Sequence, residues 1–176
     1  MSFNNNENKL LLCACKKYLK NQKNGILLID LNKINENDKI NNNIKFLNTD
    51  YFEVHCFCQL SILKVLSIRN PDSLIEKTNY FLAGGFDIKR KKGIIKLYEI
   101  LKIIDGKYEI EKVQDIIIEN NNEFKGFNGA ISCIEQQKNN GNILLTCWDG
   151  YIYSFLYPNL EDFYLKKDYS IKKFFL

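Results

Sequence analysis

The sequence predicts an all-β protein made of antiparallel strands. Short apolar segments rich in Ile, Val, Tyr, Phe and Leu are separated by polar clusters of Asn, Lys, Asp and Gly, as in proteins built from short strands. Several segments alternate with a period of two; in residues 151–155 three aromatic side chains share one face, opposite Ile152 and Ser154. No long segment keeps the period of about 3.6 residues that marks an amphipathic helix.

Length and composition indicate one folded unit. The chain has 176 residues, of which 45% are hydrophobic, which suits one domain and excludes general disorder. No apolar stretch approaches the roughly 18 residues of a membrane helix, and the first residues do not have the pattern of a signal peptide. We therefore expect an intracellular, cytoplasmic protein without membrane insertion.

Two biases in composition bear on the kind of partner. The chain has 23 Asn, 23 Ile and 23 Lys but only two Arg, Arg69 and Arg90; Asn, Ile and Lys are the residues that an AT-rich genome encodes most often. Bidentate contacts to bases and phosphates favour Arg, and a net charge of +4 is small for a polyanion-binding protein. A nucleic-acid partner is therefore not expected.

An internal repeat is the strongest feature of the sequence. Residues 10–31, 81–100 and 143–156 each begin with an apolar pair and small residues, continue through a polar turn that ends in glycine, and close with an apolar strand. The turn glycines are Gly25, Gly93 and Gly150. We expect them to supply the positive φ that tight hairpins require, as in the Asp149-Gly150 turn.

The hairpin at residues 142–155 resembles the middle hairpin of a WD40-type β-propeller repeat, and Leu82–Asp87 followed by Gly93–Tyr98 resembles it with an insertion. The resemblance implies three consecutive blades, a partial first blade with an Asn-rich loop at 1–52, a second at 53–125 and a third with a C-terminal tail at 126–176. No Gly-His pair precedes the repeats, and the turn glycines lie 68 and 57 residues apart instead of about 40–45. The pattern therefore indicates a divergent, loop-rich propeller.

The number of blades predicts an incomplete ring. Propellers close with about four to eight blades, so we expect the chain to be part of a larger propeller or to associate with itself through open blade edges. A self-contained β-sandwich is the alternative fold.

Six cysteines lie in apolar runs, where reduced cysteine behaves as a small hydrophobic residue; they are Cys13, Cys15, Cys56, Cys58, Cys133 and Cys147. We expect core cysteines, with no bound metal and no other cofactor. The alternative is a zinc site that combines the two Cys-x-Cys pairs with His55, the only histidine.

The candidate functional residues are a run of four basic side chains and the only tryptophan; they are Lys89, Arg90, Lys91, Lys92 and Trp148. The basic run can bind an acidic partner surface or phosphate, or it can form a solvated loop. Trp148 can be an exposed anchor for a partner or pack beside the propeller channel. No catalytic constellation is visible, so the sequence predicts a non-catalytic module that binds other proteins; the alternative is an enzyme or ligand-binding propeller with its site in the central channel.

Overall fold

The computed structural model describes residues 2–5, 8–16, 23–33, 44–60, 75–103, 108–116, 119–120, 123–124, 126–137, 142–156 and 171–175. Within these residues the regular structure is β, apart from one 3-10 turn, η1 (Leu31–Lys33). The predicted all-β class is thereby confirmed. None of the described residues forms a helix with the length and apolar character needed to cross a membrane.

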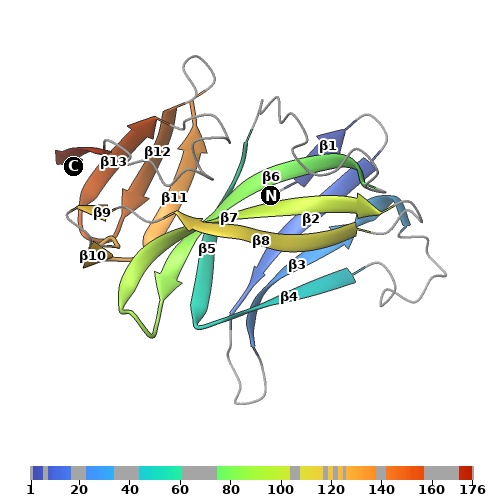
Figure 1. Ribbon diagram of the computed structural model, residues 1–176, viewed down its shortest axis with the longest axis horizontal. Helices are drawn as coiled ribbons and strands as arrows, with labels where there is room; N and C mark the ends of the chain where they lie inside the picture. The colour runs from blue at the N-terminus through green and yellow to red at the C-terminus, as the bar shows by residue number, and fades with distance from the viewer. Residues whose placement is uncertain are drawn as a thin grey trace.

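Twelve strands form three antiparallel sheets of four strands each (Figure 1). Sheet 1 contains β1 (Ser2–Asn5), β2 (Asn8–Cys15), β3 (Asn24–Asp30) and β4 (Ile44–Asp50). Sheet 2 contains β5 (Phe52–Gln59), β6 (Ile75–Asp87), β7 (Lys92–Ile103) and β8 (Tyr108–Ile116). Sheet 3 contains β11 (Ile131–Gln136), β12 (Asn142–Cys147), β13 (Tyr151–Leu156) and β14 (Ile171–Phe175). A short pair, β9 (Glu119–Asn120) and β10 (Glu123–Phe124), precedes sheet 3.

Each sheet is a meander in which the strands lie side by side in chain order. The three hairpins of the sequence repeat are the middle strand pairs of the three sheets, β2–β3, β6–β7 and β12–β13. Sheet 1 also has four strands, because β1 pairs with β2. The sequence repeat alone assigns it only a partial set of strands. Among the described strands the three four-stranded sheets are separate, and none closes into a barrel.

Sheet 2 lies between the other two sheets and contributes to both apolar cores. The core between sheets 1 and 2 contains Leu10, Leu12, Ile26, Leu28, Phe52, Val54, Phe81, Ala83, Ile94, Tyr98, Ile100 and Tyr108. The core between sheets 2 and 3 contains Cys58, Leu60, Tyr80, Leu82, Ile95, Leu97, Phe127, Ile131, Ile134, Ile143, Leu145, Cys147 and Tyr153. Neighbouring residues of β6 and β7 therefore face opposite cores, as the period of two requires.

Bulges in β5 and β11 change which side chains are buried. The register of β5 shifts between Val54 and Cys56, so Val54 faces sheet 1 whereas Cys56 packs against the core toward sheet 3. The register of β11 shifts between Ile131 and Cys133. Ile131 and Ile134 consequently both enter the core, and Cys133 is exposed.

The expectation of core cysteines is therefore wrong for Cys133, because the bulge turns its side chain out of the core. Cys58 and Cys147 are buried, and three others are half-buried: Cys13, Cys15 and Cys56.

The turn glycines serve two different purposes. Gly150 has a φ of 85°, as predicted. Gly25 and Gly93 lie inside strands without a positive φ, and in the β6–β7 turn Lys91 takes that conformation instead, with a φ of 54°. A Cβ on Gly93 would collide with the carbonyl of Gly129. The predicted turn role is therefore wrong for both Gly25 and Gly93. A Cβ on Gly25 would collide with the Phe46 ring, so close approach of other chain segments, and not a turn, requires these two glycines.

Candidate functional site

The four basic residues Lys89, Arg90, Lys91 and Lys92, here called the basic turn, lie on a well-anchored connection between β6 and β7. The buried carboxylate of Asp87 accepts a 2.9 Å hydrogen bond from the backbone N–H of Arg90. The N–H of Ile88 donates a 2.9 Å hydrogen bond to the carbonyl of Tyr51. The backbone is thus fixed from both sides, and the basic side chains project from a rigid turn.

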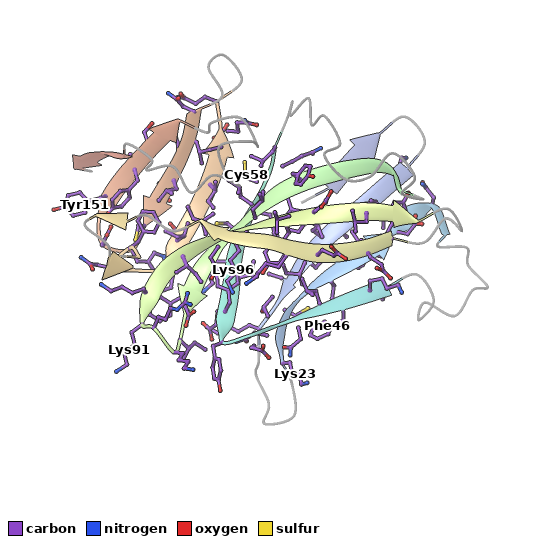
Figure 2. The ribbon with its side chains drawn as sticks, viewed as in Figure 1. Lys23, Phe46, Cys58, Lys91, Lys96 and Tyr151 are labelled. Atoms are coloured by element: carbon purple, nitrogen blue, oxygen red, sulfur yellow. The ribbon has the colours of Figure 1, made fainter. Side chains whose placement is uncertain are left out.

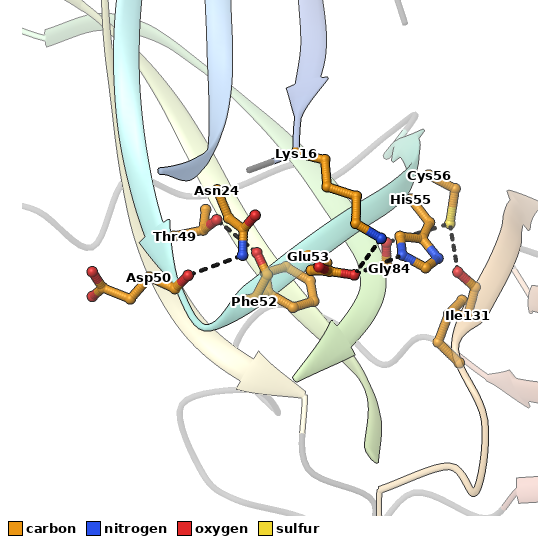
Figure 3. A network of polar contacts seen from close by, with 10 residues as sticks. All are labelled: Lys16, Asn24, Thr49, Asp50, Phe52, Glu53, His55, Cys56, Gly84 and Ile131. Atoms are coloured by element: carbon orange, nitrogen blue, oxygen red, sulfur yellow. Dashed lines mark hydrogen bonds and ion pairs between the residues drawn. The ribbon is translucent and has the colours of Figure 1, made fainter. Parts of the chain in front are cut away.

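Tyr51 is the single residue between β4 and β5, where the chain passes from sheet 1 to sheet 2. Asn24 Nδ2 donates a 3.1 Å hydrogen bond to the carbonyl of Asp50, and Thr49 Oγ1 donates a 2.7 Å hydrogen bond to that of Phe52 (Figure 3). Asp50 has a φ of 51°. This corner holds the Tyr51 ring at the surface, 59% exposed, next to the basic turn.

Arg90 is held by two carboxylates and so has a structural role as well. Its Nε lies 3.8 Å from Asp87, and its Nη1 lies 3.5 Å from Asp115. Lys112 shares Asp115 at 3.4 Å. These side chains are partly solvated, so each pair contributes little stability, but together they direct the guanidinium toward β8.

The three lysines of the basic turn lack acidic partners in the part of the chain that the structure describes. The Nζ of Lys89 lies 5.8 Å from the centre of the Tyr51 ring, a cation–π geometry. Lys92 Nζ donates a 2.7 Å hydrogen bond to Asn128. Lys91 is exposed and extends away from the ribbon (Figure 2). Their positive charge is therefore available to an acidic partner.

Lys96 of β7 adds a half-buried cation behind the basic turn. Its Nζ lies 4.5 Å from the centre of the Phe52 ring. Burial lowers the pKa of Lys96, and the nearby carboxylate of Asp115 opposes this shift. The Lys96 side chain therefore packs on the Phe52 ring and is less exposed than Lys89 and Lys91.

Trp148 is 72% exposed, so of its two interpretations the structure has the exposed one. The backbone N–H of Trp148 donates a 2.9 Å hydrogen bond to the carbonyl of Ala130, and the backbone N–H of Gly150 donates one of 3.1 Å to the carbonyl of Cys147. The Asp149 carboxylate accepts a 2.6 Å hydrogen bond from the hydroxyl of Tyr153, and burial and this bond raise the pKa of Tyr153. The turn is therefore rigid while the indole ring is in solvent.

A line of side chains connects Trp148 to both other sheets. The Trp148 and His55 rings have centres 5.5 Å apart at an interplanar angle of 42°. His55 Nε2 lies 3.8 Å from Glu53 Oε2, which also pairs with Lys16 Nζ at 2.8 Å (Figure 3). Trp148 belongs to sheet 3, His55 and Glu53 to sheet 2, and Lys16 follows β2 of sheet 1. We call these four residues the inter-sheet row.

The inter-sheet row and the basic turn form one surface, here called the turn surface. The strand pairing places Glu53 opposite Phe86, next to the start of the turn. On the other side, Asn128 bonds Lys92 and the next residue, Gly129, lies against Trp148. The structure therefore brings together the predicted residues of β6–β7 and Trp148, although they are far apart in the sequence.

Sequence reasoning did not place His55 at this surface. The sequence suggested it only as a zinc ligand. Its position beside Trp148 follows from the β5 bulge, whose register is set by pairing with β6, about 30 residues later in the chain. No local signal in the sequence could have revealed it.

The ligands of the alternative zinc site do not converge. Cys13 and Cys15 pair with Leu27 and Gly25 of sheet 1, whereas Cys56 and Cys58 pack at the core between sheets 2 and 3. In the described residues no three His, Cys, Asp or Glu side chains are arranged to hold a metal ion. Burial raises the pKa of Cys56 to about 12 and that of Cys58 to about 11, so both thiols are neutral at physiological pH.

The turn surface thus offers an exposed aromatic ring, a rigid cluster of lysines and a histidine, which suits recognition of a macromolecular surface. Comparison of the chain with protein-family models, curated proteins and solved structures gives no match.

Proposed function

We propose that the chain is a non-catalytic, WD40-like repeat module that binds another protein through the turn surface. The partner segment is acidic and carries an apolar side chain that packs on Trp148. The three meander sheets support the repeat assignment, since each contains four antiparallel strands in chain order and propeller blades are four-stranded sheets.

The exposure of Trp148 is the observation that carries the proposal. Because the backbone at Trp148 is rigid, little conformational entropy is lost when a partner covers the indole ring. Trp is also enriched among the residues that dominate binding energy. His55 contacts one side of the ring. Trp148 is nevertheless 72% exposed, and this exposed surface is available to a partner.

The charge of the basic turn specifies the partner further. Lys89 and Lys91 are exposed and Lys92 is half-buried, and no described carboxylate lies within ion-pair distance of any of the three. Complementary charge speeds encounter and selects among partners more than it adds affinity. An acidic segment that also reaches Trp148 would therefore bind with a strong dependence on salt.

The test uses a fluorescein-labelled peptide in which Asp and Glu residues flank a central Phe, and a second peptide with Asn and Gln at the same positions. Fluorescence anisotropy should show that the acidic peptide binds and that its affinity falls as salt is raised. Trp148→Ala should weaken binding at least about tenfold, and Lys91→Glu should mainly slow association.

The matched control is Lys45→Glu, because Lys45 is also exposed but lies at the opposite end of β4 from the corner. It should leave binding unchanged. Equal affinity for the two peptides, or full binding by Trp148→Ala, would contradict the proposal. Preferential binding of a single-stranded oligonucleotide of the same charge would contradict it as well.

A further inference from the structure

The chain contains three Asn-Gly dipeptides, which begin at Asn24, Asn128 and Asn140. Asparagine is a thermolabile residue, and it loses its side-chain amide most readily when glycine follows. Glycine has no Cβ, so its own backbone nitrogen approaches the asparagine Cγ without hindrance. The third dipeptide lies outside the described residues, and the first two have opposite environments.

The Asn24-Gly25 dipeptide is protected by burial and by strand pairing. Asn24 is 3% exposed, and its Nδ2 donates a 3.1 Å hydrogen bond to the carbonyl of Asp50. Both residues of the dipeptide belong to the central strand β3, and Gly25 pairs with Cys15 on one side and with Asn48 on the other. The backbone nitrogen of Gly25 therefore reaches the side chain of Asn24 only when the sheet opens.

The Asn128-Gly129 dipeptide lies at the surface, in a bend between the bridge residue Phe127 and β11. Two backbone hydrogen bonds join Phe127 to Gly93, and the carbonyl of Gly129 accepts a 3.2 Å hydrogen bond from the thiol of Cys147. The side chain of Asn128 is exposed between these anchors and belongs to none of the described strands. Water therefore reaches the Asn128 amide without any opening of a sheet.

Lys92 contacts the reacting group directly. Its Nζ donates a 2.7 Å hydrogen bond to Oδ1 of Asn128. Negative charge builds on this oxygen when the nitrogen of Gly129 adds to Cγ of Asn128. A donor that is already in place where charge develops stabilises the transition state more than the ground state. The ammonium group of Lys92 should therefore speed the reaction.

We propose that Asn128 deamidates spontaneously and thereby converts an amide of the turn surface into a carboxylate. The backbone nitrogen of Gly129 forms a bond to Cγ of Asn128 and gives its proton to solvent. The bond from Cγ to Nδ2 breaks, and Nδ2 takes up a proton from solvent and leaves as ammonia. Water then opens the cyclic imide at one of its two carbonyl groups, which leaves aspartate or isoaspartate at position 128. Water is the only co-reactant.

The product lowers the positive charge of the basic turn. The new carboxylate lies where Lys92 now meets the amide, so it pairs with a lysine that has no acidic partner among the described residues. An acidic partner segment is consequently held more weakly. This effect on binding rests on the proposed function, whereas the reaction itself does not.

Peptide mapping of the full, folded chain at mildly alkaline pH tests the reaction. Trypsin releases residues 126–138 as one peptide, in which Asn128 is the only asparagine, and residues 24–33 as the peptide that contains Asn24. Each deamidation raises the peptide mass by about one dalton, and fragmentation locates the site. Asn128 should convert at least about tenfold faster than Asn24, because a buried strand reacts only through local opening.

Substitution of single lysines tests the contribution of the ammonium group. Lys92→Met should slow the conversion of Asn128 about fivefold. Lys91→Met is the matched control, since it removes the same charge from the neighbouring position of the turn, and it should leave the rate unchanged. Equal rates in the two variants would overturn the part assigned to Lys92.

Two further outcomes would overturn the reaction itself. The first is an unmodified Asn128 in the folded chain under conditions in which a synthetic peptide of residues 126–138 converts. The second is an equal rate of conversion at Asn128 and Asn24.

Asn128→Asp reproduces the charge of the product and tests the effect on binding. It should bind the acidic peptide about threefold more weakly than the wild type, as expected for one surface charge. Asn32→Asp is the matched control, because Asn32 is also exposed but lies on η1, beyond the other end of β3. Equal binding by Asn128→Asp and the wild type would overturn the charge effect. A wild type that does not bind the acidic peptide would contradict the proposed function and leave the mapping result intact.

Discussion

The hydroxyl of Tyr80 donates a 2.8 Å hydrogen bond to the carboxyl group of Glu99, and both side chains are buried. The two residues are direct neighbours across β6 and β7. Tyr80 belongs to the core between sheets 2 and 3. This polar contact therefore lies inside an otherwise apolar layer, where a missing hydrogen bond is costly.

Tyr80→Phe should lower the free energy of unfolding by about 2 kcal/mol, because it removes a hydrogen-bond donor from a buried carboxyl group. Urea denaturation followed by circular dichroism measures the change. Tyr51→Phe is the matched control, since Tyr51 is 59% exposed, and it should change stability very little. Equal effects of the two substitutions would show that the buried hydrogen bond contributes no more than a solvated hydroxyl.

Gly93→Ala should destabilise the chain by about 3 kcal/mol, as overpacking does. The new Cβ would collide with the carbonyl of Gly129 and lie 3.1 Å from the Cβ of Phe127. It would also disturb the two backbone hydrogen bonds, of 2.9 and 3.0 Å, between Gly93 and Phe127. Thermal unfolding measures the loss.

Gly150→Ala provides the comparison for that prediction. A Cβ at Gly150 meets nothing within 4 Å, but the φ of 85° is strained for alanine, at a cost of about 1 kcal/mol. If Gly150→Ala destabilises the chain more than Gly93→Ala, close packing at Gly93 is not the constraint described above.

Stability should fall with rising pH above about 9, because of the buried thiols. Burial raises the pKa of Cys56 to about 12 and that of Cys58 to about 11, from an ordinary value of 9.0. Above pH 9.0 the thiols ionise in the unfolded chain but stay neutral in the folded chain. Unfolding therefore releases protons, and rising pH stabilises the unfolded state relative to the folded state. The contribution is fully present below pH 9.0 and is lost as the pH approaches the folded values. The urea midpoint measured against pH tests this.

The double variant Cys56→Ala and Cys58→Ala separates these thiols from other alkaline effects. It should be less stable at neutral pH, because the substitutions leave small cavities. Its stability should nevertheless decline less steeply than that of the wild type above pH 9.0. An unchanged slope would show that other groups cause the decline.

The middle hairpins could be predicted from the sequence because their signals are local. Alternation of apolar residues and the Asp149-Gly150 turn are both contained within a few residues, and the structure has strands and a turn there. The bulges of β5 and β11 are not local, because each depends on pairing with the next strand of its sheet. For the same reason Cys133 was expected in the core and is exposed.

The candidate site was predictable only in part. The basic turn and Trp148 stand out by residue type, but nothing in the sequence indicates that Asn128 and Gly129 join them. Gly93 lies 36 residues before Gly129 in the chain, and only tertiary packing shows that they meet. The glycine at position 93 therefore indicates a local constraint in the sequence, but its cause, the contact with Gly129, is visible only in the folded structure.

The central position of sheet 2 has a consequence for how the chain unfolds. Phe81 and Leu82 are consecutive residues, each 0% exposed, yet they belong to different cores. Sheets 1 and 3 can each separate at the loss of one core, whereas sheet 2 can open only when both are lost. In stacked repeats stability is a sum of units and neighbour contacts, so opening should begin at the two ends and reach the middle last. Amide protons of β6 and β7 should accordingly exchange with solvent more slowly than those of β3 or β12.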